Sequence, residues 1–383
     1  MPRSLAQGDD LGGVITDLWV RPASMWQAFP GTSLSQRYHH DLADCQVIAW
    51  NGRALLREAG RRLFLSRWRG YRSSNCWFMN YSVRMLRKHA ASQPGRRPTL
   101  FAYSYAAREQ LRYAKAAGWK TILGQIDGGP AEERIVQALE VGAGTSRDYS
   151  SPAPADYWAS WREELQLADV VMVNSKWSKT LIEREPVAAG KIAVVPLAYA
   201  RPTGSLSFRR EYPGNFDAAR PLQLLFLGQL VPRKGIMLVF DAIRKLCSEP
   251  VHFTLVGPRE VEIPSDLREH PQIRWVGRVS RSETTRFFQE ADVFLFPTFS
   301  DGFGLTQLEA QAWRLPVIAS RCCGEVITHQ ANGLQLGEVT AEALCQAIMF
   351  CCHNPGALQR FSDNAVDLEQ FSLRMLGKRL LDL

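Results

Sequence analysis

Short apolar runs rich in β-branched residues recur along the chain and alternate with longer stretches of helical periodicity. In the first half, the runs that predict strands are 14–20, 46–49, 100–102, 121–126, 170–173 and 192–195. In the second half they are 222–227, 252–256, 273–276, 293–296 and 317–319. Helical patterns occupy 106–117, 131–138 and 175–185 between strands, and this alternation is typical of mostly parallel sheets covered by helices.

The pattern predicts an α/β chain of two doubly wound, Rossmann-like domains that face a cleft. Pro, Gly, Arg and Ser dominate the segment 201–220, so we expect a linker between an N-terminal domain (1–200) and a C-terminal domain (221–355). Residues 356–383 predict closing amphipathic helices. The first strand signal begins only near Gly13, so the first domain either lacks its opening strand–turn–helix unit or keeps a remnant of the turn at 4–12.

Composition indicates which cellular compartment and which kinds of partner to expect. No run reaches eighteen apolar residues, the N-terminus has no apolar core of a signal peptide, and the eight cysteines are scattered without zinc spacing. We therefore expect a cytoplasmic protein with reduced thiols. The net charge of +8 favours anionic partners. Nucleic acid is not expected, because the basic residues match no nucleic-acid-binding motif.

Basic clusters at 61–62, 67–72 and 84–88 are interleaved with aromatic residues at positions 68, 71, 77, 78 and 81. Two interpretations stay open. The clusters form a patch that contacts an anionic acceptor or the inner face of a membrane, or they are solvated arginines on helices whose aromatic side chains face the core.

A first candidate site follows the predicted strand 222–227. Gly228 allows a ligand close to the backbone at the strand end, where open α/β sheets bind ligands. Arg233 and Lys234 then precede an amphipathic helix, where they oppose the positive end of the helix dipole unless an anion lies between them. Arg offers a bidentate fork to phosphate oxygens and Lys a point charge, so the pair predicts phosphate binding; the alternative is two solvated cations.

A second candidate site follows the predicted strand 293–296. The sequence Ser300-Asp-Gly-Phe-Gly-Leu-Thr-Gln-Leu-Glu309 predicts a tight turn and then a helix beginning near Leu305. Asp301 and Glu309 can face one cleft and accept hydrogen bonds from sugar or ribose hydroxyls. The alternative is structural: Thr306-x-x-Glu309 matches a capping box, and Asp301 suits an ordinary turn.

The stretches LGQLVPRKG and SDGFGLTQLEAQAWRLPVIAS together resemble the C-terminal half of retaining glycosyltransferases of family 4, which have the GT-B fold. The resemblance is specific over 222–336, and VVMVNSKWSKTLI resembles the end of that family's first domain. It implies that Arg233 and Lys234 bind the donor diphosphate, Glu309 the ribose hydroxyls and Asp301 the donor sugar. It further implies sugar or phosphate contacts from the backbone of Gly302, Phe303, Gly304 and Leu305, and recognition of the base by the backbone at Val279.

The sequence departs from the family in two places. Asp301 stands where the family has a longer Glu, which leaves the donor sugar open. The usual histidine after the middle strand of the first domain is absent, and Tyr103 or Tyr105 stands there instead. Asp127 and Gln125 follow the strand 121–126 and are expected to line the cleft. His39 and His40 are weaker candidates for a base, and we read Glu132 and Glu133 as a match to a helix dipole.

These features predict a hexosyltransferase that moves a sugar from a UDP- or GDP-linked donor to a glycan, lipid or small-molecule acceptor. We expect retention of anomeric configuration, no cofactor and no metal, since no Asp-x-Asp motif is present. The alternatives are another GT-B enzyme, such as an epimerase or an inverting transferase, and a catalytically impaired protein that binds nucleotide sugars or glycans.

Overall fold

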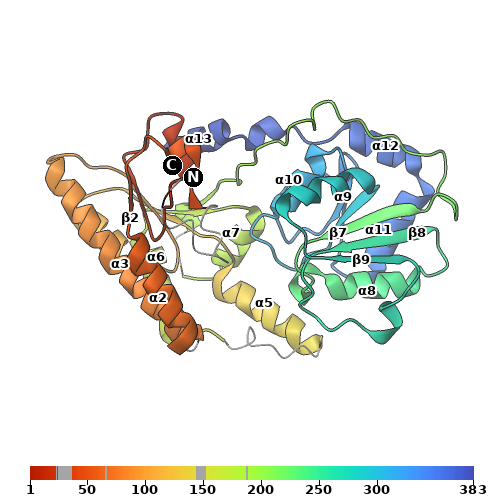
Figure 1. Ribbon diagram of the computed structural model, residues 1–383, viewed down its shortest axis with the longest axis horizontal. Coiled ribbons are helices and arrows are strands. Elements are labelled where there is room, and N and C mark those ends of the chain that lie inside the picture. The colour runs from red at the N-terminus through yellow and green to blue at the C-terminus, as the bar shows by residue number, and fades with distance from the viewer. Residues whose placement is uncertain (23, 25–36, 65–66, 144–151, 187–188) are drawn as a thin grey trace.

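The computed structural model describes residues 1–22, 24, 37–64, 67–143, 152–186 and 189–383 (Figure 1). Two parallel sheets, one in each half of the chain, define an N-terminal and a C-terminal domain that lie side by side. The side chains of 58–67 are not described, so the basic pair at 61–62 lies outside the described side chains.

The N-terminal sheet has the order β3-β4-β5-β6, and all its pairs are parallel. Its strands are Leu100–Tyr103, Thr121–Gly124, Val170–Val173 and Ile192–Val194. A separate parallel pair, β1 (Val14–Thr16) and β2 (Val47–Ala49), precedes it. The helices are α1 (Pro2–Ala6), α2 (Asn51–Phe64), α3 (Arg67–Ser92), α4 (Arg108–Ala116), α5 (Gly129–Gly142), α6 (Ala155–Leu167) and α7 (Lys176–Ile182), with a 3-10 turn η3 at His40–Leu42.

The C-terminal sheet has six parallel strands in the order β12-β11-β10-β7-β8-β9, so the strand order reverses between β10 and β7. In chain order, β7 to β12 are Leu222–Leu227, Val251–Val256, Ile273–Gly277, Val293–Phe296, Val317–Ala319 and Gly333–Gln335. The helices are α8 (Ile236–Lys245), α9 (Thr284–Glu290), α10 (Leu305–Ala312), α11 (Ala341–His353), α12 (Pro355–Asp363) and α13 (Leu373–Leu381), and Pro232–Lys234 form the 3-10 turn η6.

Alternate residues of the central strands fill separate cores on the two faces of each sheet. In β7, Leu224 and Phe226 pack with α8, α11 and α12, whereas Leu225 packs with α9 and α10. In β4, Leu123 packs with α4, α6 and α7, whereas Ile122 faces α13 and α1. The chain therefore ends by crossing back, because the helix α13 closes the second face of the N-terminal sheet.

Two further observations bear on the expectations from composition. All eight cysteines are free in the structure. Within the described ranges, none of the helices combines the length and the apolar character needed to cross a bilayer.

Candidate functional site

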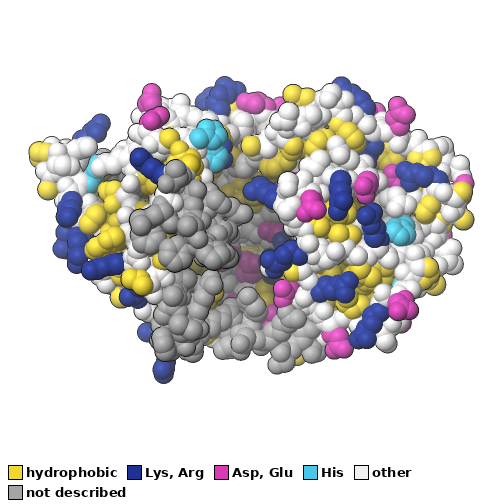
Figure 2. Space-filling view, in the orientation of Figure 1, with side chains coloured by type: hydrophobic (Ala, Val, Ile, Leu, Met, Phe, Trp, Pro, Cys, Tyr) yellow, Lys and Arg dark blue, Asp and Glu magenta, His cyan; other side chains and the backbone are white. Residues whose placement is uncertain are grey.

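The candidate site lies at the carboxyl ends of β7 and β10, where the strand order of the C-terminal sheet reverses. Open α/β sheets bind ligands at this place, because the loops from the two strands diverge and leave a crevice. Gly228 follows β7 there and, with Lys234, Phe296 and Thr306, lines a small cavity of about 50 Å³. Figure 2 shows a hollow between the two domains in which basic and acidic side chains are visible.

The turn that carries the two cations is fastened to the loop after β10. Gly235 has a φ of 81°, and a Cβ at this position would lie 2.1 Å from the carbonyl oxygen of Pro297. Only glycine allows this approach. The carbonyl oxygen of Arg233 accepts hydrogen bonds from the Phe299 N–H at 2.8 Å and from the Thr298 hydroxyl at 3.1 Å. The two candidate motifs, about seventy residues apart in sequence, thus form one structural unit.

Arg233 and Lys234 point to carboxylates and to one carbonyl. Arg233 Nη1 donates to the Ser300 carbonyl oxygen at 2.5 Å and lies 3.6 Å from Oε1 of Glu132, which belongs to the N-terminal domain. Lys234 Nζ forms an ion pair with Asp301 Oδ2. Both cations remain partly exposed, 27% for Arg233 and 20% for Lys234, so a phosphate can reach them. The structure therefore brings the two cations next to the loop of the second motif.

The loop 300–304 combines a turn with a close contact between the domains. Asp301 Oδ1 accepts a 3.4 Å hydrogen bond from the Phe303 N–H, while its other oxygen binds Lys234. A Cβ on Gly302 would lie 2.7 Å from the carbonyl oxygen of Ile126, so its absence lets the N-terminal backbone approach. The Phe303 ring is buried in the core, which leaves only the backbone of this residue for a ligand.

The helix α10 begins at Leu305, as expected, but its cap is Gly304, and no side chain caps it. The capping-box alternative for Thr306 and Glu309 is therefore wrong: with Gly304 at the cap, Thr306 lies inside the first turn. The Glu309 carboxylate is 18% exposed, and its one ion pair among the described residues is with Arg281, at 4.0 Å. Burial raises the pKa of Glu309, and the nearby positive charge of Arg281 opposes that rise. A half-buried carboxylate with unused acceptor capacity suits hydroxyl binding.

The N-terminal domain contributes Asp127, which is held by a network of hydrogen bonds. Its Oδ1 accepts from the Tyr105 hydroxyl, from Gln125 Nε2 at 3.1 Å and from the Gly129 N–H at 2.8 Å. Burial raises the pKa of Asp127, while these donors and the charge of Arg233 counteract the rise. Tyr105 is thereby engaged in structure, whereas Tyr103 at the end of β3 is 50% exposed and its ring packs edge-on against Phe101.

The helix α7 joins the two domains directly at the site. Its Trp177 indole N–H donates to the Ser300 hydroxyl at 2.9 Å, and the Ser178 hydroxyl donates to the Gly302 carbonyl at 3.2 Å. The Lys176 N–H donates to Glu325 at 3.0 Å. The loop that carries Asp301 is therefore positioned by residues from both domains.

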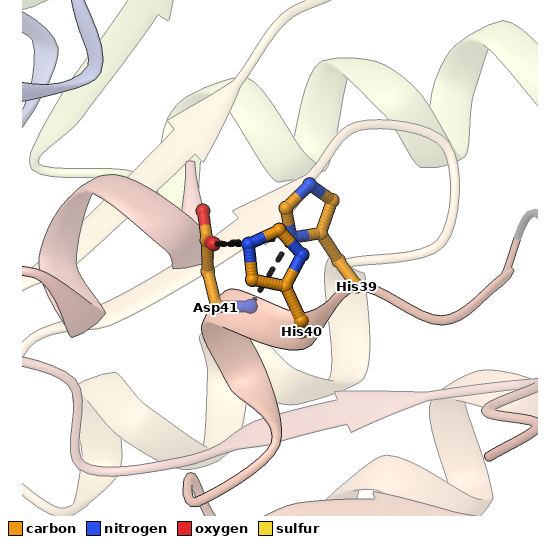
Figure 3. Close-up of side chains that lie close together, drawn as sticks. All are labelled: His39, His40 and Asp41. Atoms are coloured by element: carbon orange, nitrogen blue, oxygen red, sulfur yellow. Dashed lines mark hydrogen bonds and ion pairs between the residues drawn. The ribbon is translucent and has the colours of Figure 1, made fainter. Parts of the chain in front are cut away.

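The remaining candidates lie farther from the cations. Val279 is half-buried in the loop after β9 and packs on the core next to α9 and α10. His39, His40 and Asp41 cluster in η3 (Figure 3), where His40 Nε2 lies 2.8 Å from Asp41 Oδ1. Arg3 Nε donates to the other oxygen of Asp41 at 2.8 Å. The guanidinium supplies the positive charge that a metal ion would bring, so the cluster links η3 to α1 and fits a metal poorly.

Three contributors were missed by the sequence analysis. Glu132 does accept from the Gly128 N–H at the start of α5, as the dipole interpretation requires, but its second oxygen reaches Arg233. Trp177 and Thr306 border the site without a chemical signature in the sequence. The resemblance of VVMVNSKWSKTLI to the family was the one signal that could have directed attention to Trp177.

Comparison with known proteins finds similarity to glycosyltransferases. Residues 221–354 match the family model Glycosyl transferases group 1. An uncharacterized glycosyltransferase of Methanocaldococcus jannaschii, MJ1178, is 27% identical over 152 residues, which cover 38% of this chain and 42% of that protein. The match thus spans less than half of that protein's length and less than half of this chain.

Solved structures match along nearly the whole chain. Sucrose-phosphate synthase from Thermosynechococcus elongatus superimposes with a TM-score of 0.65 at 16% identity, covering 100% of this chain and 90% of that one. HepE from Anabaena, in complex with UDP, superimposes with a TM-score of 0.60 at 13% identity, covering 97% of this chain and 99% of that one. The chain therefore has the GT-B fold, and its residues 221–354 are similar to the glycosyl transferases group 1 family.

Proposed function

We propose that this protein is a glycosyltransferase that takes a sugar from a nucleoside-diphosphate donor bound at the carboxyl ends of β7 and β10. The observation that carries the proposal is the convergence of Arg233 and Lys234 with the loop of Asp301 at one strand-order reversal, with Glu309 just over one turn into the helix α10 that follows this loop. Two cations that face a cleft suit a diphosphate, and carboxylates beside them suit the hydroxyls of ribose and sugar. The match of residues 221–354 to group 1 glycosyltransferases supports this assignment.

In the proposed reaction the bond between the anomeric carbon and the diphosphate oxygen breaks, and a bond from an acceptor oxygen to the same carbon forms. The leaving diphosphate gains negative charge as the bond breaks. Arg233 and Lys234 stabilise that charge more in the transition state than in the ground state, which is how such cations accelerate transfer. The acceptor proton passes to the departing phosphate oxygen.

Retention of configuration is part of the proposal, because this route needs no strong protein base. Its support is the resemblance of residues 222–336 to family 4. We also propose that transfer needs no metal ion or cofactor, since Arg233 and Lys234 supply the positive charge for the diphosphate. Turnover that survives chelation, with the donor's anomeric configuration kept in the product, would support both points; loss on chelation would refute the second.

For the donor we propose a UDP- or GDP-linked sugar, and for the acceptor a glycan, a lipid or a small molecule. The complex of HepE with UDP supports uridine. Asp301 forms an ion pair with Lys234, so the choice of donor sugar depends on how this short carboxylate realigns when the diphosphate binds to Lys234.

Calorimetric titration of UDP and GDP tests the site. We expect Arg233→Ala and Glu309→Ala to weaken binding at least tenfold each, because a charge-assisted hydrogen bond contributes roughly 1.5–3 kcal/mol. Matched controls are Arg244→Ala on α8, whose partners are Asp241 and Asp266, and Glu290→Ala on α9, which pairs with Arg274. Unchanged nucleotide affinity in both site variants would show that the site is misassigned.

Product analysis separates the proposal from its alternatives. A transferase consumes donor and acceptor together, whereas an epimerase converts the donor sugar with no acceptor. An inverting transferase gives the opposite anomer. Tight nucleotide-sugar binding without turnover across a panel of acceptors would favour a binding protein.

A further inference from the structure

Positive charge is concentrated in one part of the chain that the proposed donor site does not use. Residues 59–108 contain 11 of the 46 Lys and Arg residues and none of the 38 Asp and Glu residues. The rest of the chain therefore holds 35 basic against 38 acidic residues and is slightly negative, so the net charge of +8 comes from this segment alone. The helix α3 occupies 26 of its residues.

The described cations of α3 lie along one exposed stripe. Arg69, Arg72, Arg84, Arg87 and Lys88 are all exposed and follow helical spacing, with exposed Cys76 and Asn80 between them. At 1.5 Å per residue, the stripe extends over about 28 Å. Helical spacing of three and four places such residues on the same side of a helix.

Few acidic groups neutralise the stripe. Arg72 pairs with Asp156, but within the described part of the chain Arg69, Arg84, Arg87 and Lys88 have no carboxylate within 4.0 Å. The Arg87 guanidinium lies over the ring of Tyr113, 5.9 Å from its centroid, and keeps its charge. A stripe of uncompensated cations attracts a polyanionic surface.

The neighbouring helix adds exposed apolar side chains. α2 packs antiparallel to α3. Arg57 Nη2 donates to the Ser73 hydroxyl at 2.6 Å, and the ring centroids of Trp50 and Tyr81 lie 5.2 Å apart. On α2, Leu56 is 75% exposed, and the Arg53 guanidinium lies 4.3 Å from the ring of Trp50. Along the left edge of Figure 2, where Figure 1 places these helices, basic and hydrophobic side chains are interspersed.

We propose that the exposed face of the α2–α3 hairpin docks on a bilayer surface that contains anionic phospholipids. Cations beside exposed Leu and Trp are the combination with which helices bind in the interface of a membrane, the charges attracted to headgroups and the apolar groups inserted between them. A nucleic acid would use the same cations but would gain little from Leu56. The exposed leucine therefore favours the lipid surface.

Co-sedimentation of the full-length protein with vesicles tests this surface. We expect binding to phosphatidylcholine vesicles that contain phosphatidylglycerol, little binding to phosphatidylcholine alone, and loss of binding at high salt. The triple variant Arg84→Gln, Arg87→Gln, Lys88→Gln should bind roughly 100-fold more weakly, since each basic residue near an anionic surface contributes about a fivefold factor. The control variant Arg209→Gln, Arg360→Gln, Lys378→Gln removes the same charge elsewhere on the surface and should bind normally.

Two readouts keep the outcome interpretable. Both triple variants should retain the wild-type affinity for UDP or GDP, which shows that they fold and separates this surface from the donor site. Leu56→Ser should weaken vesicle binding while leaving its salt dependence in place. Equal binding of wild-type and Arg84/Arg87/Lys88 variants to anionic vesicles would overturn the proposal. Equally, binding to a DNA oligonucleotide that exceeds vesicle binding and is insensitive to Leu56→Ser would assign the surface to nucleic acid.

Discussion

Glu132 offers a test of whether the cations of the site are poised for an anion. In the structure its Oε1 lies 3.6 Å from Arg233 Nη1, across the boundary between the domains. A donor diphosphate must take over Arg233 from this carboxylate and tolerate its negative charge. The variant Glu132→Gln removes the charge and retains an oxygen that can accept the Gly128 N–H bond.

The size of the effect follows from the distance. Two unit charges 3.6 Å apart interact by about 1 kcal/mol in bulk water and by about 5 kcal/mol at the effective dielectric constant of a protein surface. The exposed fractions of Arg233 and Glu132 are 27% and 13%, so solvent screening reduces the contribution toward the lower value. We therefore expect nucleoside diphosphate to bind about tenfold more tightly to Glu132→Gln, a gain of about 1.4 kcal/mol.

Calorimetry with UDP and GDP measures this change directly. Glu133→Gln is the matched control, because it removes one charge from the same turn of α5. The wild-type Glu133 carboxylate accepts hydrogen bonds from the Ala153 N–H and the Trp158 indole N–H and does not pair with Arg233. The gain should shrink as the pH is lowered, since burial raises the pKa of Glu132 and protonation removes its charge in the wild type as well. An unchanged or weaker affinity in Glu132→Gln would refute the reasoning and make Glu132 a support for Arg233.

Two further predictions concern the framework of the site. Gly235→Ala places a Cβ 2.1 Å from the Pro297 carbonyl oxygen at a φ of 81°. We therefore expect a loss of about 2–4 kcal/mol in unfolding free energy, measured by thermal unfolding, and weaker nucleotide binding. The control Gly214→Ala should show no comparable loss, because its added Cβ meets no atom within 4 Å. Burial raises the pKa of Glu164 from 4.5 to about 7, so the folded state binds more protons than the unfolded state in that window, and the contribution of Glu164 to stability falls as the pH rises through it. In urea unfolding, the stability advantage of the wild type over Glu164→Gln should shrink by about 3 kcal/mol between pH 4.5 and 7, and a difference that stays constant with pH would contradict this.

Much of the fold follows from local sequence patterns. The strands β7, β8 and β10 are predominantly apolar, with Gln223, His252 and Thr254 as the polar exceptions, as expected for parallel strands covered on both faces. Their predicted bounds agree with the structure within about one residue. The strand β12 was missed because Gly333–Gln335 is three residues long and has no β-branched side chain. It pairs with β11 by virtue of its position in the sheet, which a local pattern does not contain.

Local sequence patterns predicted only part of the candidate site. Arg233 and Asp301 each stand in a motif with a local physical signature, a cation pair before a helix and a glycine-rich turn after a strand. The capping-box question at Glu309 needed the structure, because Thr306-x-x-Glu309 fits both interpretations until Gly304 is seen at the cap. The contact of Glu132 with Arg233 could not be predicted from local sequence, because it exists only through the packing of the two domains. The local role of Glu132 at the start of α5 was predicted, and the structure contains it.

The central claim is that a nucleoside diphosphate binds between the cations of η6 and the start of α10. A crystal structure of the protein with UDP or GDP tests it most directly. We expect diphosphate oxygens within hydrogen-bonding distance of the Arg233 and Lys234 side chains, with the ribose hydroxyls at Glu309. A nucleotide bound with its diphosphate elsewhere, with Lys234 still paired to Asp301, would contradict the account.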